Sequence, residues 1–164
     1  MTDHREQLLQ FLALERAHVI RSVEGLSDEQ TLRSLLPSGW SCAGLIRHLA
    51  LDVEAYWFQC TMRGDDIADL VARTGPDDGW SVPAATSPHD IIDLYRAECA
   101  TADAIIATYD LDDTPAWIDP RWGGWSPPNL HYLLLHVITE TACHAGHLDA
   151  ARELIDGHQN LVLA

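Results

Sequence analysis

The chain has 164 residues, of which 47% are hydrophobic, and a mean hydropathy of −0.08. This length suits one domain with one substantial core, and no apolar run approaches the ~20 residues of a membrane-spanning helix. The formal net charge is −15, lysine is absent, and the ten basic residues are dispersed arginines. Because binding to nucleic-acid phosphates depends on clustered Lys and Arg, this composition argues against a nucleic-acid partner. We expect a single cytoplasmic domain over residues 1–164, since the N-terminus MTDHREQLLQ lacks the apolar segment of a signal peptide.

The first 62 residues predict two long helices separated by a short one. Residues 3–24 carry apolar side chains at helical spacing, with Leu14 among them, and Gly25 follows as a stop signal. A short helix is predicted over 27–36, where it must end ahead of a proline. A serine then caps a second long helix that runs over 41–62.

His48 lies on the edge of the apolar face of the 41–62 helix, and Asp52 follows one turn later. Asp52 could hold the His48 ring as a hydrogen-bond acceptor. A solvated carboxylate is the commoner outcome and the one we expect. Taken alone, a histidine on a helix is also more often a hydrogen-bonded boundary residue than a metal ligand, so His48 is a candidate ligand only in combination with others.

One further long helix lies between two irregular segments. The short helical piece DDIADLVAR precedes a turn-rich loop at 74–86, and Ser87-Pro88 then begins a helix that runs to Tyr109. The following link, 110–129, holds three Trp, four Pro and two Gly. Links of this length often form lids or binding loops. The tryptophans could equally cover the end of the core, so the role of residues 114–128 stays open.

The last predicted helix, LHYLLLHVITETACHAGHLDAARELID, carries several potential metal ligands on one face. At about 100° per residue, its His136, Glu140, His144 and His147 fall within a stripe roughly 80° wide. Metal-type ligands on a stripe that also faces the core cost free energy unless something satisfies them. Glu140 and His144, one turn apart, can converge on one divalent ion. One helix cannot comfortably supply a third tetrahedral ligand, and His48 is the best candidate elsewhere.

Two stretches, PSGWSCAGLIRHLALDVEAYWF and WSPPNLHYLLLHVITETACHAGHLDAARELIDG, resemble the DinB/YfiT-like metalloenzymes. The chain is most similar to the branch that includes mycothiol S-transferases and the metal domain of mycothiol-dependent maleylpyruvate isomerase. The resemblance covers nearly the whole chain, and the ending HxGHxDxxRExIDG is its most specific part.

This resemblance implies an all-α, DinB-like four-helix bundle, with a long crossover loop before the last helix. It also implies a divalent metal, zinc or nickel, between the second and fourth long helices. The mycothiol-dependent branch uses one His from the second helix and a Glu-x3-His pair from the last, which correspond here to His48, Glu140 and His144. His147 could replace Glu140 as a ligand or hydrogen-bond a metal-bound water, and we retain the ligand set of the family.

The expected function is metal-dependent thiol transfer. Three protein ligands leave an open coordination position, as in catalytic zinc sites, where the metal would activate a low-molecular-weight thiol for attack on a small electrophile. The resemblance implies that this thiol is mycothiol. His147 is the nearest candidate for a catalytic residue. The alternatives are a metal-hydroxide hydrolase and a non-enzymatic, metal-stabilised protein that binds a small ligand. A homodimer is compatible with such a bundle.

Overall fold

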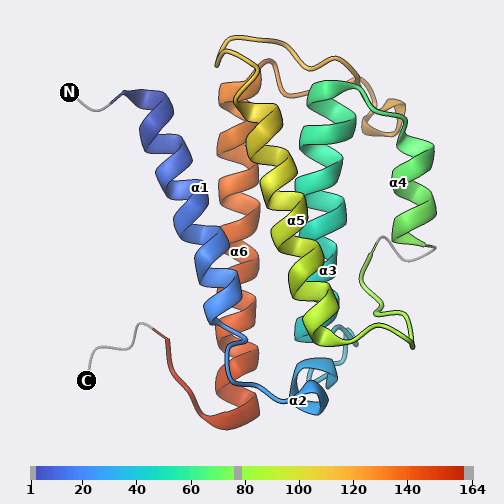
Figure 1. Ribbon diagram of the computed structural model, residues 1–164, viewed down its shortest axis with the longest axis vertical. Helices are drawn as coiled ribbons and strands as arrows, with labels where there is room; N and C mark the ends of the chain where they lie inside the picture. Colours follow the sequence, from blue (N-terminus) through green and yellow to red (C-terminus); the bar gives the residue numbers. More distant parts are fainter. Residues whose placement is uncertain (1–2, 76–78, 161–164) are drawn as a thin grey trace.

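The computed structural model describes residues 3–75 and 79–160, and over these ranges it contains helices and no β-strand. Four long rods stand side by side (Figure 1): α1 (His4–Arg21), the continuous rod of α3 (Cys42–His48) and η1 (Leu49–Arg63), α5 (Pro88–Ile106) and α6 (Leu130–Asp156). The shorter α2 (Asp28–Leu32) and α4 (Ile67–Thr74) lie outside this set. The predicted all-α four-helix bundle is confirmed.

The helix starts follow local capping chemistry, which the sequence shows directly. The side chain at each N-cap accepts a hydrogen bond from a backbone N–H of the first turn, at Asp3, Ser27, Ser41, Ser87 and Asn129. The ends differ more from prediction: α1, α2 and α5 each end a few residues early, and turn or extended backbone follows them. Within the predicted loop at 74–86, residues 76–78 lie outside the described residues.

The second long helix changes its winding at the position of the first candidate ligand. Up to His48 it is α-helical, and from Leu49 to Arg63 it is a π-helix, which ends at Gly64 with φ +87°. The helix predicted over 41–62 has the expected extent, and its change to π-helical winding was not predicted. π-helical segments occur frequently at functional sites, and this one carries a large part of the cavity wall described below.

The core is mainly apolar, and it contains a buried ion pair between two of the long helices. Leu12, Phe58 and Leu133 are among its fully buried side chains. Arg16 of α1 donates two hydrogen bonds of 2.7 and 2.6 Å to the carboxylate of Glu54 in η1, and both residues are buried. Leu14, predicted to join the apolar stripe of α1, is instead exposed.

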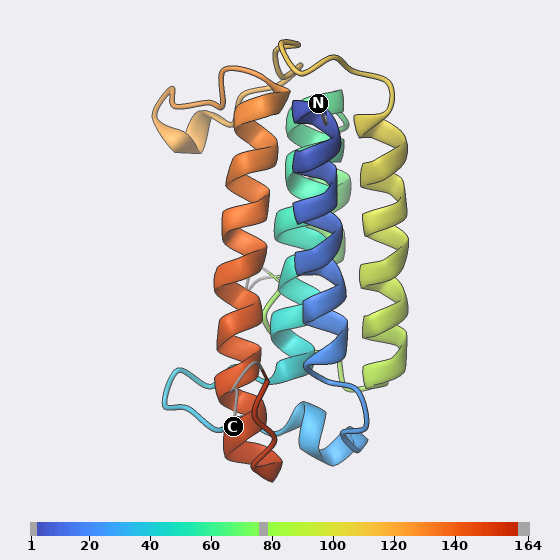
Figure 2. The same cartoon turned by 90° about the vertical axis from the view of Figure 1, so that its left-hand side faces the viewer.

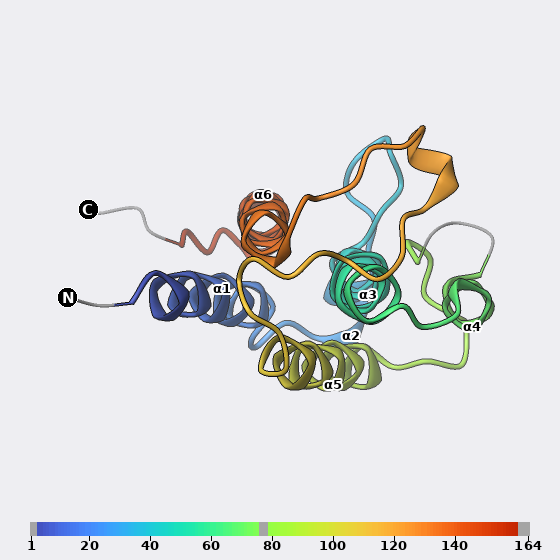
Figure 3. The ribbon, with the colours of Figure 1, turned by 90° about the horizontal axis from the view of Figure 1, so that it is seen from above.

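The connection between α5 and α6 crosses the end of the bundle. Seen from above, these two helices stand at opposite corners, with α1 and α3 at the other two (Figure 3). The backbone N–H groups of Ala116 and Trp117 donate to the carbonyls of Met62 and Thr61 at the end of η1, each at 3.1 Å. The chain then forms the 3-10 turn η2 (Pro120–Trp122) and projects beside the bundle before α6 begins (Figure 2). Within the described ranges, the structure has no helix long and apolar enough to cross a membrane.

Candidate metal centre and adjoining cavity

The three predicted ligands come together between two rods. His48 is the last residue of α3, while Glu140 and His144 lie one turn apart in α6. One nitrogen of each imidazole and one carboxylate oxygen all lie within 4.8 Å of one another. The side chains of His48 and His144 are only 14% and 11% exposed, and that of Glu140 is 39% exposed. The three residues that the sequence predicts as metal ligands thus form a single cluster.

The donor atoms are spaced as a divalent ion requires. Two atoms bound to one tetrahedral zinc at ~2.1 Å lie about 3.4 Å apart. His144 Nε2 and Glu140 Oε1 are 3.2 Å apart, so this pair already has that spacing. The third donor, on His48, lies within 4.8 Å of the other two and needs to approach by no more than about 1.4 Å, which is within reach of a side-chain rotation. The residues present therefore fit a metal ion with two nitrogen ligands and one oxygen ligand.

Each histidine has a partner for its other ring nitrogen. His48 Nδ1 lies 3.0 Å from Asp52 Oδ2 and donates to it in the tautomer that satisfies the carboxylate, and in this tautomer Nε2 carries no proton. His144 Nδ1 lies 3.4 Å from His147 Nδ1. Such contacts fix the tautomer and the ring orientation of metal-binding histidines. The expectation that Asp52 would be a solvated charge was wrong.

The ring of His144 is held in its neutral form. Burial lowers its pKa, and the neighbouring His48 lowers it further, against the opposing effect of the Glu140 carboxylate. A neutral imidazole is the form that binds a metal. The environment of this residue therefore favours ligation at neutral pH.

Trp80 covers the two histidines, and sequence reasoning gave it no role. Its indole stacks on the His48 ring, with centroids 4.1 Å apart and planes 16° apart, and meets the His144 ring edge-on at 5.8 Å. The approach is close because Gly44 of α3 has no side chain: a Cβ there would lie 2.2 Å from the backbone oxygen of Trp80. A glycine inside a helix was the one sequence signal that could have indicated this contact.

The other two histidines of the α6 stripe point elsewhere. His147 is exposed and lies on the Nδ1 side of His144, near Trp40 at a centroid distance of 6.3 Å. His136 lies two turns before His144 and packs edge-on against Trp57 at 4.6 Å. Burial lowers the pKa of His136, although the charge of Glu140 opposes this shift.

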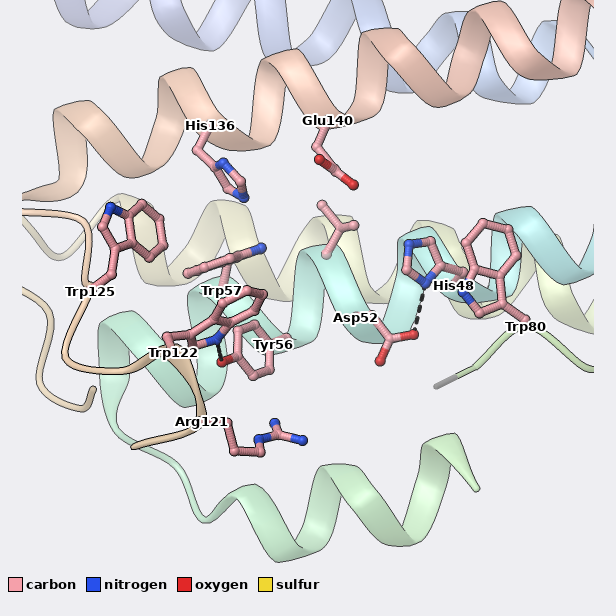
Figure 4. Close-up of a pocket in the computed structure, with 11 residues that line it drawn as sticks. His48, Asp52, Tyr56, Trp57, Trp80, Arg121, Trp122, Trp125, His136 and Glu140 are labelled. Carbon is pink, nitrogen blue, oxygen red and sulfur yellow. Dashed lines mark hydrogen bonds and ion pairs between the residues drawn. The ribbon is translucent and has the colours of Figure 1, made fainter. Parts of the chain in front are cut away.

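A cavity of about 740 Å³ opens beside the ligands. Figure 4 shows its two ends: His48, Asp52, Trp80 and Glu140 lie at one, and aromatic side chains lie at the other. The remaining lining residues come from η1, from the α5–α6 connection and from α6: Val53, Tyr56, Trp57, Arg121, Trp122, Trp125 and His136. The predicted link at 114–128 thus contributes to a cavity wall.

A chain of hydrogen bonds fixes that link to the bundle. Trp122 Nε1 donates to the Tyr56 hydroxyl at 2.6 Å, and this hydroxyl donates to Asp119 Oδ2 at 2.9 Å. Burial raises the pKa of Tyr56 to about 12, so the phenol keeps the proton that it donates. Arg121 completes the group through a 2.6 Å ion pair with Asp119. Figure 4 shows the bond between Trp122 and Tyr56.

The sequence matches one family model over most of its length. The family model of the mycothiol-S-transferases matches residues 7–157, a range that includes His48, Glu140 and His144. The comparison with curated proteins found no match. The description of the matching family supports a transferase type of function related to mycothiol, in agreement with the resemblance of the two signature stretches. The chain therefore belongs to the mycothiol S-transferase family, with the DinB-like bundle expected of it.

Proposed function

We propose that this protein is a divalent-metal-dependent thiol transferase in which His48, Glu140 and His144 hold the metal. The observation that carries the proposal is a cluster of three ligand side chains, two of which, His48 and Glu140, line one end of a cavity large enough for a small molecule. Three protein ligands leave an open position, which distinguishes catalytic from structural zinc sites. The two-nitrogen, one-oxygen donor set favours zinc, and nickel is also competent for such a site. Mycothiol is the proposed thiol because the chain matches its transferase family.

The proposed reaction transfers a thiol sulfur to an electrophilic carbon. When bound, a divalent ion lowers the pKa of a thiol in its open position, which supplies the nucleophile. The thiol proton passes to solvent water, the sulfur electron pair forms the new S–C bond, and the leaving group takes the electrons of the bond that breaks. Asp52 orients the ring of His48, and Trp80 shields the ligand histidines from water on one side.

The sequence predicts His147 as the catalytic histidine, and this stays a prediction. Its nitrogen contacts His144 Nδ1, and His147 is not among the residues that line the cavity. This geometry supports an action of His147 through His144, whose ring it would orient, rather than a contact with substrate.

The test combines metal content with turnover. Wild type, His144→Ala and His89→Ala are purified in parallel, with His89 as the control because it is an exposed histidine of α5 that is no part of the cluster. Bound metal is measured by elemental analysis, and consumption of a panel of alkyl and aryl electrophiles is followed with and without mycothiol. We expect about one metal per chain and mycothiol-dependent turnover in wild type and in His89→Ala, and neither in His144→Ala.

Two other outcomes would replace the proposal. Metal-dependent consumption that does not need the thiol would indicate a hydrolase. Metal binding without any turnover across the panel would indicate a metal-stabilised binding protein. A homodimer of this single domain also stays a prediction, which light scattering across a range of protein concentrations would test.

A further inference from the structure

Three tryptophans from two parts of the chain form one wall of the cavity. Trp57 belongs to η1, and Trp122 and Trp125 belong to the α5–α6 connection. Their ring centroids are 6.2 to 6.3 Å apart in all three pairs. A ligand ring inserted between two facing indoles needs about 7 Å between them. The indoles therefore pack against one another, within the usual range for aromatic pairs, and present a continuous surface rather than a slot.

The wall is pre-formed, and two of its three indoles are exposed to solvent. Trp57 is 6% exposed, whereas Trp122 and Trp125 are 51% and 43% exposed. The hydrogen bond from Trp122 Nε1 to Tyr56 prevents the indole of Trp122 from turning freely into the core. Exposed apolar surface costs free energy in water. A fixed aromatic surface beside a cavity is typical of a ligand contact, since a pre-organised site loses less entropy on binding.

The aromatic end of the cavity carries little net charge. Arg121 is the only Lys or Arg among the described lining residues, and its guanidinium is paired with Asp119 at 2.6 Å. His136, which borders the wall, has a pKa lowered by burial, so its ring is neutral at neutral pH. The carboxylates of Asp52 and Glu140 lie at the opposite end (Figure 4). This distribution favours an uncharged, planar, apolar group as the ligand of the wall.

We propose that the wall of Trp57, Trp122 and Trp125 binds a planar aromatic group of the electrophile, whose reacting carbon lies at the His48–Glu140 end. This inference rests on the proposed function. A water-soluble thiol is recognised mainly by hydrogen bonds, and the Trp122 Nε1 donor of the wall is already used by Tyr56, while the neighbouring Arg121 is paired with Asp119. The aromatic surface therefore belongs to the electrophile, and aryl or benzylic electrophiles are preferred over alkyl electrophiles of equal reactivity.

The first test is binding without reaction. Titration calorimetry is performed with 2-naphthylmethanol and with its saturated, non-planar counterpart, decahydro-2-naphthylmethanol. We expect the planar probe to bind wild type about two- to tenfold more tightly than the saturated one, which is the range of an aromatic contact. Trp125→Leu loses this preference and Trp125→Phe keeps it. Trp117→Leu, which changes a tryptophan of the same connection outside the cavity, also keeps it.

The second test assigns the wall to a substrate. In steady-state kinetics with mycothiol and a benzylic halide, Trp125→Leu raises the KM of the halide about two- to tenfold and leaves the KM of mycothiol unchanged. A rise confined to the KM of mycothiol, or equal binding of the planar and saturated probes by a working transferase, would overturn the inference alone. Planar preference in a protein that never transfers the thiol would instead refute the proposed function and the assignment to its electrophile.

Discussion

Each histidine of the candidate centre has one ring nitrogen in contact with a neighbouring polar side chain, which orients the ring. His48 has a carboxylate partner at 3.0 Å, and His144 has an imidazole partner at 3.4 Å. A carboxylate acceptor fixes the tautomer of a ligand and raises its basicity, so removal of such a partner typically costs 10- to 100-fold in metal affinity. The shorter contact to the charged acceptor is the stronger of the two.

Asp52→Asn should accordingly weaken metal binding by about 10- to 100-fold, with all three ligands retained. The measurement is competition against a chromophoric chelator. Asp149→Asn serves as the control, because it changes the carboxylate of another Asp–His pair, with His18 at 2.8 Å, that is no part of the cluster. An unchanged affinity in Asp52→Asn would show that the contact does not support the centre.

His147→Ala separates a catalytic role from a positioning role. If His147 orients His144, as the 3.4 Å contact suggests, the variant binds metal more weakly and regains near-normal kcat at saturating metal. His147→Gln, which can still accept a hydrogen bond, should be milder. Loss of kcat at full metal occupancy, together with the loss of one limb of the pH–rate profile, would establish the catalytic role instead.

Two glycines, one in α3 and one directly before Trp80, allow the Trp80 segment to pack closely against the second long helix. A Cβ on Gly44 would lie 2.2 Å from the Trp80 carbonyl oxygen, and one on Gly79 would lie 2.6 Å from Asp52 Oδ2. Gly79 also has a φ of +80°, which other residues rarely adopt. At Gly44 the close contact is with backbone, so no rotation of a flexible side chain could relieve a clash there, and the stacking of Trp80 on His48 depends on this glycine.

Two glycine substitutions in helices should have opposite effects on stability. Gly44→Ala should lower the free energy of unfolding by about 1–3 kcal/mol and weaken metal binding, because the Trp80 segment must move from His48. Gly146→Ala, in α6, meets open space and should raise that free energy by about 0.5–1 kcal/mol through helix propensity. Urea unfolding of both metal-free variants measures the difference. A neutral Gly44→Ala would show that the segment shifts without cost.

The attachment of the α5–α6 connection should weaken in acid. Asp119 forms an ion pair with Arg121. Hydrogen bonds from Arg121 lower the pKa of Asp119 to about 2, which is below the pKa of this carboxyl in the unfolded chain. A depressed pKa stabilises the fold above the unfolded value near pH 4, and this stability is lost as the pH falls towards 2. The contribution is at most about 2 kcal/mol, since Arg121 is exposed and screened. Urea unfolding from pH 5 to pH 2.5 should show a shallower slope for Asp119→Asn than for Asp112→Asn, an exposed control.

Local signals predicted the elements, whereas contacts between distant segments could not be predicted from them, and only the family resemblance joined His48 to the Glu140–His144 pair. Capping residues such as Ser87 and Asn129 act within one turn, so the sequence shows where their helices begin. The spacing of Glu140 and His144 likewise follows from one helix. The stacking of Trp80 on His48 and the Trp122–Tyr56 hydrogen bond join segments 32 and 66 residues apart. No periodicity within one element encodes such pairs.

The arrangement of the bundle places the candidate ligands where they can join two rods of the molecule. α3 supplies His48, and α6, which follows after the crossover, supplies Glu140 and His144. An ion held by all three would bind the folded chain and not a chain in which these helices have separated. Metal binding should therefore stabilise the entire fold in proportion to RT ln(1 + [M]/Kd).

This linkage gives a test that needs no substrate. At a free zinc concentration of about 1,000 times Kd, the free energy of unfolding should rise by roughly 4 kcal/mol, which corresponds to an increase in Tm of roughly 8–16 °C for a chain of this size. His144→Ala should unfold at the same temperature with or without zinc, while His89→Ala should keep the full increase. Differential scanning calorimetry of chelator-treated protein measures both. An equal increase in His144→Ala would mean that zinc stabilises the fold from a different set of the nine histidines, and the proposed centre would then be wrong even if the enzyme proved to need metal.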